Sequence, residues 1–183
     1  MAKNRLCLRA DRELQKEMED QVDIVYGATA IALHRYYGWG RGRIMSLFEM
    51  TRQIWNTCAK DPDMSMLRML EEETGIEIQA RGCDRSYHDL LYLNGLSANA
   101  RDMKPAEYIY MRRRQKPWVN PQITAAMLLA LHRKCGWGGL RDQTLLNLKD
   151  DVENSLDHNH KAILEAARDE IGIDIFMENR KNG

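Results

Sequence analysis

Apolar residues recur at steps of three and four along most of this chain, the spacing that gathers side chains on one face of an α-helix. The first and longest stripe consists of Leu14, Met18, Val22, Val25, Thr29, Ala32 and Tyr36. Glycines follow this stripe and later ones, at Gly38, Gly75, Gly136 and Gly172. Glycine commonly ends a helix because it adopts the left-handed conformation at little cost. The pattern predicts an all-α fold.

The same pattern sets the expected limits of several helices. Residues 1–10 precede the first stripe and are expected to be frayed. A helix opened by Pro105 is expected to end at Lys116-Pro117. Asn120-Pro121 is expected to supply the N-cap and the first position of the next helix, and Asp157 is expected to cap the last one.

One segment of the sequence occurs twice. Residues 32–40 read ALHRYYGWG, and residues 130–138 read ALHRKCGWG. At the same offset the matches continue with Arg43 and Arg141, Leu47 and Leu145, Ile54 and Val152, and, after one deletion, residues 75–78 and 172–175. Self-similarity at a fixed spacing is the sequence signature of a repeated structural unit.

The duplication predicts two homologous three-helix units with a helical segment inserted between them. Residues 11–79 form the first helical repeat, 80–119 a basic insert of two helices, 120–176 the second repeat and 177–183 a tail. A three-helix unit of this size is too small to bury its apolar stripe alone. The repeats are therefore expected to pack about a pseudo-twofold axis, as an internal version of a homodimer.

The repeated motif has two interpretations. In the structural one, which we favour, each tryptophan folds over a helical corner and each histidine bonds a polar group nearby. Its residues are His34, Trp39, His132, Trp137 and Arg141. In the functional one, two equivalent surfaces bind phosphates, because arginines near helix N-termini suit anions. The residues of those surfaces are His34, Arg35 and Arg43, and His132, Arg133 and Arg141.

A DNA-reading helix-turn-helix is another interpretation, with Gly38 as the turn glycine. The DNA contacts would come from Arg41, Arg43 and Arg52. His34, however, stands where that motif needs a small residue, because its two helices touch there. In the second repeat Asp142 takes the place of Ile44 and would put a charge into the core of the hairpin. This interpretation is kept as the alternative.

Charge is unevenly distributed, although the whole chain is neutral, with 27 basic and 27 acidic residues. Residues 80–120 carry eight basic and four acidic side chains, whereas 22–79 and 121–176 are net acidic. Basic side chains interleaved with aromatic ones suit a phosphate backbone with stacking bases. A solvated helix end is the other explanation, because basic residues complement the helix dipole there. The candidate contact residues are Tyr110, Arg112, Arg113, Arg114, Lys116 and Trp118.

The chain offers little for catalysis. Residues 157–160 contain the letters of a His-Asn-His nuclease, but at too narrow a spacing. Cys83 and His88 lack two further partners at the spacing of a zinc site. The sequence has no glycine-rich phosphate loop and no local signature of a nucleophile. We expect no enzymatic activity, no cofactor and no bound metal.

The compartment follows from cysteine usage and hydropathy. The four cysteines have no paired spacing, which indicates a reduced, cytoplasmic protein. The first residues lead into charge and not into the apolar run of a signal peptide. No apolar stretch approaches the ~18 residues of a membrane span, so no membrane association is expected.

The pattern Ala-Leu-His, Gly-aromatic-Gly and Arg at residues 32–43 and 130–141 resembles that of small helical proteins encoded by prophages and mobile elements of Gram-positive bacteria. Those proteins mostly carry one copy of the motif and have no assigned activity. The resemblance covers the two repeats and leaves out residues 80–119. It implies a mobile-element context and supplies no mechanism.

These features together favour a non-enzymatic binding protein of a phage or mobile element. Its expected partner is a host protein or nucleoprotein complex, and an inhibitor of a defence nuclease such as a CRISPR effector fits that role. The alternative function is a DNA-binding regulator or recombination accessory protein. Nucleic acid and a second copy of the chain stay open as further partners, because the sequence decides neither direct nucleic-acid contact nor the oligomeric state.

Overall fold

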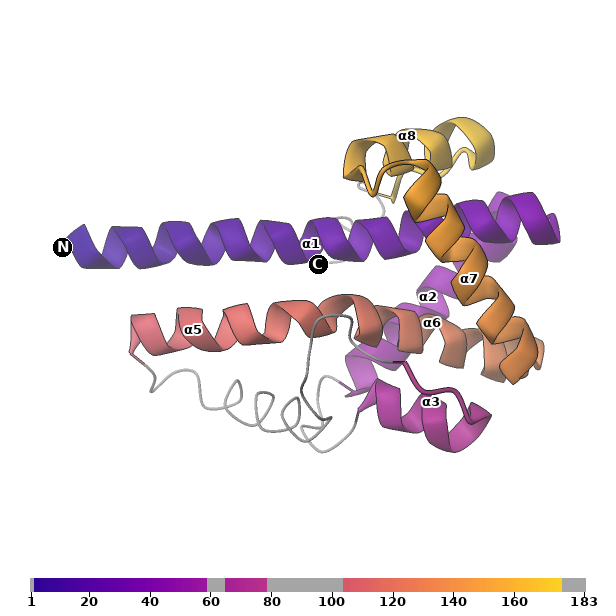
Figure 1. Ribbon diagram of the computed structural model, residues 1–183, viewed down its shortest axis with the longest axis horizontal. Helices are drawn as coiled ribbons and strands as arrows, with labels where there is room; N and C mark the ends of the chain where they lie inside the picture. The colour runs from indigo at the N-terminus through magenta and orange to yellow at the C-terminus, as the bar shows by residue number, and fades with distance from the viewer. Residues whose placement is uncertain (1, 59–64, 79–103, 176–183) are drawn as a thin grey trace.

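The computed structural model describes residues 2–58, 65–78 and 104–175, and every regular element among them is helical (Figure 1). The predicted all-α class is confirmed for this part of the chain. In chain order the elements are α1 (Ala2–Tyr37), α2 (Arg41–Cys58), α3 (Met66–Thr74), α5 (Pro105–Gln115), the 3-10 turn η2 (Lys116–Trp118), α6 (Val119–Cys135), α7 (Gly139–Ser155) and α8 (His160–Ile171). The expected first helix of the insert and the tail lie outside the described residues.

α1 is 36 residues long and begins well before the first apolar stripe. Residues 2–10 are helical, so the expected fraying of residues 1–10 is wrong for this stretch. Alanine, leucine, lysine and arginine dominate it, and all four favour helices. One turn further on, Arg9 Nε lies 2.9 Å from Glu13 Oε1, a stabilising spacing on a helix surface. An apolar stripe predicts only the buried part of a helix, because an exposed extension of the helix needs no apolar residues.

Helices that are distant in sequence form the main packing contacts. α1 packs against α7 and α8, and α6 packs against α2 and α3. The consecutive pairs α1–α2 and α2–α3 contact each other much less. The N-terminal half of α1 runs beside α5 and extends beyond the other helices (Figure 1). The long first helix therefore connects parts of the chain that are far apart.

Small and aliphatic side chains fill the centre of the molecule, where α1 and α6 pass through the core. Residues 28–33 of α1 and 125–131 of α6 are buried. The close approach is clearest at Gly27, where an added Cβ would lie 2.5 Å from Ile163 Cγ2 of α8. Large fully buried side chains complete the core, among them Ile31, Leu33, Ile44, Leu47, Leu70, Met127 and Leu131.

Glycine ends the helices as the sequence predicted. Gly38 has φ +65° and Gly136 φ +62°, a conformation that L side chains rarely adopt. The Gly38 N–H donates to the carbonyl of His34, which is the bond of an αL stop, and the Trp39 N–H donates to the carbonyl of Leu33. Gly75 and Gly172 end α3 and α8 in the same conformation.

Two predicted helix starts are wrong. η2 runs directly into α6, which begins at Val119, so Asn120 is a helical residue and not the N-cap. Pro121 is tolerated in the first turn because an N–H there would have no partner within the helix. The last helix begins at His160 with Asn159 as its cap, whose Oδ1 accepts from the Ala162 N–H at 3.1 Å, and not at Asp157. α5 does begin at Pro105 and end just before Lys116-Pro117, as predicted.

None of the helices in the described ranges is both long enough and apolar enough to cross a membrane.

Candidate binding surfaces

The two copies of the Gly-Trp-Gly segment meet in space. The ring centroids of Trp39 and Trp137 are 5.7 Å apart with an interplanar angle of 73°, an edge-to-face contact. The Tyr37 ring packs on Trp137 with a centroid distance of 4.9 Å. Each tryptophan is only 3% exposed. The two helical corners thus share one aromatic cluster that closes this end of the core.

Each motif histidine holds its own corner in place. Nδ1 of His34 lies 2.9 Å from the Trp39 carbonyl oxygen, and Nδ1 of His132 lies 2.7 Å from that of Trp137. A carbonyl only accepts, so Nδ1 carries the proton in both histidines. This geometry uses the imidazole to fix the turn.

Arg43 and Arg141 cover the two tryptophans from outside. The Arg43 guanidinium carbon lies 3.8 Å from the centroid of the Trp39 ring, and that of Arg141 lies 5.8 Å from the Trp137 ring. A guanidinium over an indole face is a favourable cation–π contact. Both arginines are exposed at the beginnings of α2 and α7, where each also caps the aromatic cluster.

Arg35 and Arg133 bind carboxylates within the molecule. Arg35 donates from Nε and Nη2 to Glu170 at 2.8 and 2.5 Å. Arg133 donates from the same two atoms to Glu73 at 3.0 and 2.5 Å. These hydrogen bonds lower the pKa of both glutamates and raise the pKa of both arginines.

Sequence reasoning missed the two glutamates. A signal was present, because Glu73 and Glu170 each stand two residues before the glycine that ends their helix. By binding these glutamates, Arg35 and Arg133 form part of the outer layer of the core. In each of these two arginines the Nε and Nη2 donors, which a phosphate could otherwise have bound, are thus occupied by a glutamate.

Asp142 is the most unusual polar residue of the corner. It is 0% exposed, and neither carboxylate oxygen has a hydrogen-bond partner. In the alignment of the two repeats, Asp142 of α7 corresponds to Ile44 of α2, which is also 0% exposed. Burial raises the pKa of Asp142 to about 6, partly opposed by the nearby charge of His132. The sequence comparison had placed this charge inside the hairpin, and the residue is indeed buried there.

Part of the expected basic patch on α5 faces α1. Arg112 donates to Gln15 and lies 3.9 Å from Asp11, and Lys116 Nζ lies 2.6 Å from Glu17 Oε2. The contact with Lys116 lowers the pKa of Glu17. Arg112 and Lys116 therefore bind this segment to polar and acidic side chains in the N-terminal half of α1. Trp118, 4% exposed, belongs to the core.

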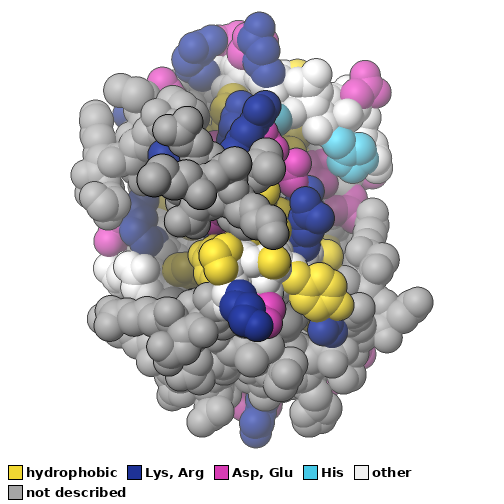
Figure 2. Space-filling view, turned by 90° about the vertical axis from the view of Figure 1, so that its left-hand side faces the viewer, with side chains coloured by type: hydrophobic (Ala, Val, Ile, Leu, Met, Phe, Trp, Pro, Cys, Tyr) yellow, Lys and Arg dark blue, Asp and Glu magenta, His cyan; other side chains and the backbone are white. Residues whose placement is uncertain are grey.

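The side of α5 that carries Tyr110 is more open to solvent, although Arg114 there is half-buried with an enclosed Nε. Tyr110 is 63% exposed, Arg113 is exposed, and the Arg114 guanidinium lies 5.8 Å from the centroid of the Tyr110 ring. The spacing of three and four residues puts them on one helical face. We call Tyr110, Arg113 and Arg114 the α5 outer face. Figure 2, which views this end of the molecule, shows basic, acidic and hydrophobic side chains intermixed.

The arginines of the helix-turn-helix alternative are placed differently from what that motif requires. α2 packs mainly against α6 and only slightly against α1, whereas the two helices of a helix-turn-helix pack on each other. Arg43 stacks on Trp39, and Arg52 lies 2.9 Å from Glu49. Arg41 is exposed at the first position of α2.

The histidines of residues 157–160 do not converge. His158 Nε2 lies 2.9 Å from Asn154 Oδ1, whereas His160 Nε2 lies 3.4 Å from Asp23 Oδ2 of α1. Within the described ranges no three side chains of histidine, cysteine, aspartate or glutamate are grouped so as to hold a metal ion. Cys83 and His88 lie outside these ranges.

Comparison of the chain with protein-family models, with curated proteins and with solved structures gave no match.

Proposed function

We propose that residues 11–79 and 120–176 are two copies of one three-helix unit, packed about a pseudo-twofold axis and joined by the insert 80–119. The support is a set of contacts that occur in pairs. Each motif histidine contacts its own tryptophan carbonyl. Each motif arginine binds the glutamate that precedes the terminal glycine of the other unit. In this arrangement the units exchange their first helices, α1 and α6.

We propose that the protein is a non-enzymatic binding protein that occupies an acidic surface of a host protein or nucleoprotein. The observation that carries this proposal is the α5 outer face, where an exposed tyrosine lies beside two arginines. Tyrosine and arginine dominate the energetics of protein interfaces. Arginine also holds carboxylates through two parallel hydrogen bonds. Inhibition of a defence nuclease, in a phage or mobile-element context, is the role that best fits such a protein.

The α5 outer face suits binding because it is held on a rigid support. Arg112 and Lys116 bind the inner side of the helix to α1, and Met111 is buried beneath it. A fixed helix presents its side chains to a partner without the entropy cost of ordering a loop. Tyr110 and Arg113 are exposed, so their substitution is expected to disturb folding less than substitution of the buried Met111.

A pull-down of tagged protein from host extract, with and without nuclease treatment, tests the proposal. We expect a stoichiometric protein partner that survives nuclease. The variant Arg113→Glu/Arg114→Glu should reduce its recovery at least tenfold. The matched control is Lys161→Glu/Arg168→Glu, which makes the same charge change on the exposed side of α8. Equal recovery with both variants would contradict the assignment of the α5 outer face.

Recovery of nucleic acid alone, lost at moderate salt, would instead support the DNA-binding alternative. That function is distinguished by the variant Arg41→Gln/Arg43→Gln/Arg52→Gln, which should abolish sequence-specific duplex binding only if α2 reads DNA. Because α2 packs on α6 and Arg43 on Trp39, we expect no such loss.

A further inference from the structure

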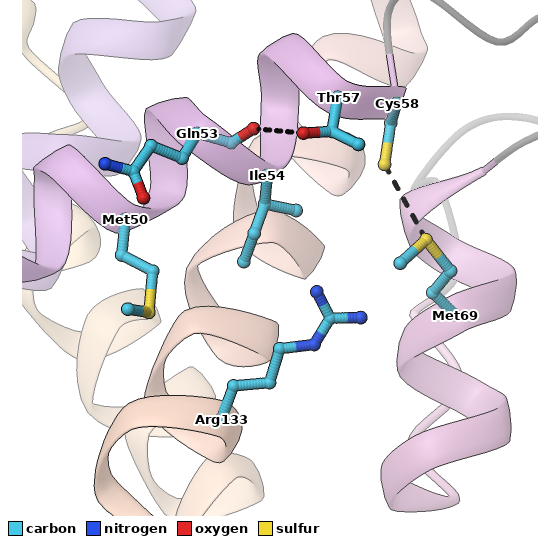
Figure 3. A pocket seen from close by; sticks show the side chains of 7 residues that line it. All are labelled: Met50, Gln53, Ile54, Thr57, Cys58, Met69 and Arg133. Atoms are coloured by element: carbon cyan, nitrogen blue, oxygen red, sulfur yellow. Dashed lines mark hydrogen bonds between the residues drawn. The ribbon is translucent and has the colours of Figure 1, made fainter.

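A cavity lies between α2, α3 and α6, away from the α5 outer face. Its volume is about 260 Å³, and it is lined by Met50, Gln53, Ile54, Thr57, Cys58, Met69 and Arg133 (Figure 3). One water-sized group occupies about 30 Å³, so the cavity holds roughly eight such groups. That is the size of a short organic molecule and larger than a packing defect.

Apolar and sulfur-containing side chains form most of the wall. Ile54 of α2 points towards Arg133, and Met50 and Met69 lie on either side (Figure 3). Cys58 Sγ lies 3.6 Å from Met69 Sδ. Methionine is unbranched and polarisable, so it adapts to the shape of an apolar ligand. This wall suits an aliphatic chain.

Arg133 adds a single charged group to this wall. Its guanidinium reaches into the space between Ile54 and Met69 (Figure 3). Nε and Nη2 bind Glu73, whereas Nη1 has no hydrogen bond to the described residues. Glu73 holds the guanidinium in a fixed orientation and leaves that one donor available. A fixed donor at the edge of an apolar cavity is the usual arrangement in a small-molecule site.

Arg35 provides an internal comparison. It makes the same bidentate pair, with Glu170, at the equivalent place in the second half of the molecule. The positions equivalent to Gln53 and Cys58 are Asp151 and Leu156 there. A carboxylate and a bulkier side chain make these surroundings unfavourable for an anionic ligand. The chemistry of the cavity is therefore specific to Arg133.

We propose that this cavity binds a short aliphatic carboxylate of about six carbon atoms. The chain lies among Met50, Ile54 and Met69, and one carboxylate oxygen accepts a hydrogen bond from Arg133 Nη1. The guanidinium then serves two carboxylates at once, through separate edges, which its five donors permit. Hexanoate has eight non-hydrogen atoms and matches the volume. This site is independent of the proposed partner surface.

Titration with hexanoate, followed by NMR of protein labelled at the methionine methyl groups, tests the proposal. We expect saturable shifts of the Met50 and Met69 resonances with a Kd on the order of 1 mM. Met127, fully buried elsewhere in the core, should not shift. Hexanol has the chain without the charge and should bind at least tenfold more weakly. Equal binding of hexanol, or no saturable shift up to 20 mM, chosen as about 20 times that Kd, would overturn the proposal.

Two variants locate the site. Cys58→Leu, which copies Leu156, fills the cavity with a hydrophobic side chain and should abolish the shifts. Arg133→Gln should weaken hexanoate binding to the level of hexanol, whereas the matched Arg35→Gln should leave it unchanged. Undiminished binding by folded Cys58→Leu protein would overturn the assignment even if Arg133→Gln proved too unstable to measure.

Discussion

Arg35, near the end of α1, donates two hydrogen bonds to Glu170, near the end of α8, across 135 residues of the chain. Arg133 and Glu73 repeat this relationship between α6 and α3. The first pair joins α1 to α8, and the second pair joins α6 to α3. Each pair thus links two helices that are far apart in the sequence. The pairs therefore report directly on the packing of α1 against α8 and of α6 against α3.

Double-mutant cycles should detect this coupling. Arg35→Ala combined with Glu170→Ala, and Arg133→Ala with Glu73→Ala, should each give an interaction free energy of about 1 kcal/mol in urea unfolding. The value is modest because the four side chains are about one-third exposed. The exposed pair Arg68 and Glu72, on one helix, is the control and should give about 0.3 kcal/mol. Equal values for all three pairs would contradict a role of the bidentate pairs in fastening the helices.

The same pairs predict acid sensitivity. The pKa values of Glu73 and Glu170 are lowered from 4.5 because each carboxylate accepts from an arginine. A lowered pKa stabilises the fold above the unfolded value and loses that contribution as pH falls through the folded value. The free energy of unfolding should thus decline below about pH 4.5. The double variant Glu73→Gln/Glu170→Gln should show a smaller decline, measured by urea unfolding from pH 3 to pH 6.

The free energy of unfolding should show the opposite pH dependence at higher pH, because of Asp142. Its pKa is raised from 3.8 to about 6 by burial, so the folded state holds the proton more tightly than the unfolded state. Stability should therefore fall as pH rises from about 4 to about 6, by about 2 to 3 kcal/mol. Asp142→Asn removes the charge and should abolish this fall, giving higher stability at pH 7.

Asp142→Ile copies Ile44 and gives an independent check. It places an apolar side chain where the homologous position is buried and should raise the free energy of unfolding at pH 7 by about 2 kcal/mol. His132 remains in both variants, so the wild type and the variants are compared at each pH. Lower stability of both variants at pH 7 would show that the carboxylate has a partner in solution.

Gly27 permits the contact of α1 with α8. An added Cβ would lie 2.5 Å from Ile163 Cγ2 and 3.3 Å from Ile175 Cδ1. Gly27→Ala should therefore lower the free energy of unfolding by about 1 to 2 kcal/mol in chemical denaturation, although alanine favours helices. Gly42→Ala in α2 is the control, because nothing lies within 4 Å of its added Cβ. It should leave stability unchanged or raise it slightly.

The exchanged packing predicts that the two halves need each other. Residues 1–79 contain α2 and α3 but not α6, on which these helices pack. Expressed alone, fragments 1–79 and 80–183 should show low helicity or self-association. Mixed together they should form a one-to-one complex with restored helical circular dichroism. A stable, helical and monomeric 1–79 fragment would contradict this prediction.

Helix content and helix ends were readable from the sequence because they depend on local properties. Gly38 and Gly75 end helices through backbone freedom alone. The N-cap at Asn120 was mispredicted because a 3-10 turn before it, at Lys116–Trp118, continues directly into the helix. Local rules identify a capping residue but cannot see that the preceding turn already supplies the helical geometry.

The partners of the charged residues depend on packing and were not readable. Arg112 and Lys116 had the composition of a phosphate-binding patch, yet they contact α1, some hundred residues earlier. The apolar stripe of α1 is compatible with packing on α2 as well as on α7 and α8. The periodicity of the sequence therefore does not show which helices α1 packs against. The place of Asp142 was predictable because an aligned repeat shows which residue it replaces.

The packing of α1 against α7 and α8 also determines the order of folding events during synthesis. When α1 to α3 have left the ribosome, the helices that cover α1, namely α7 and α8, have not been made. Segments that are buried in the folded protein, such as residues 28–33, then remain exposed to solvent until translation has passed residue 171. Incomplete chains with such apolar surface are the species that aggregate or recruit chaperones. Chains that end before α8 is complete are therefore expected to be cleared rapidly.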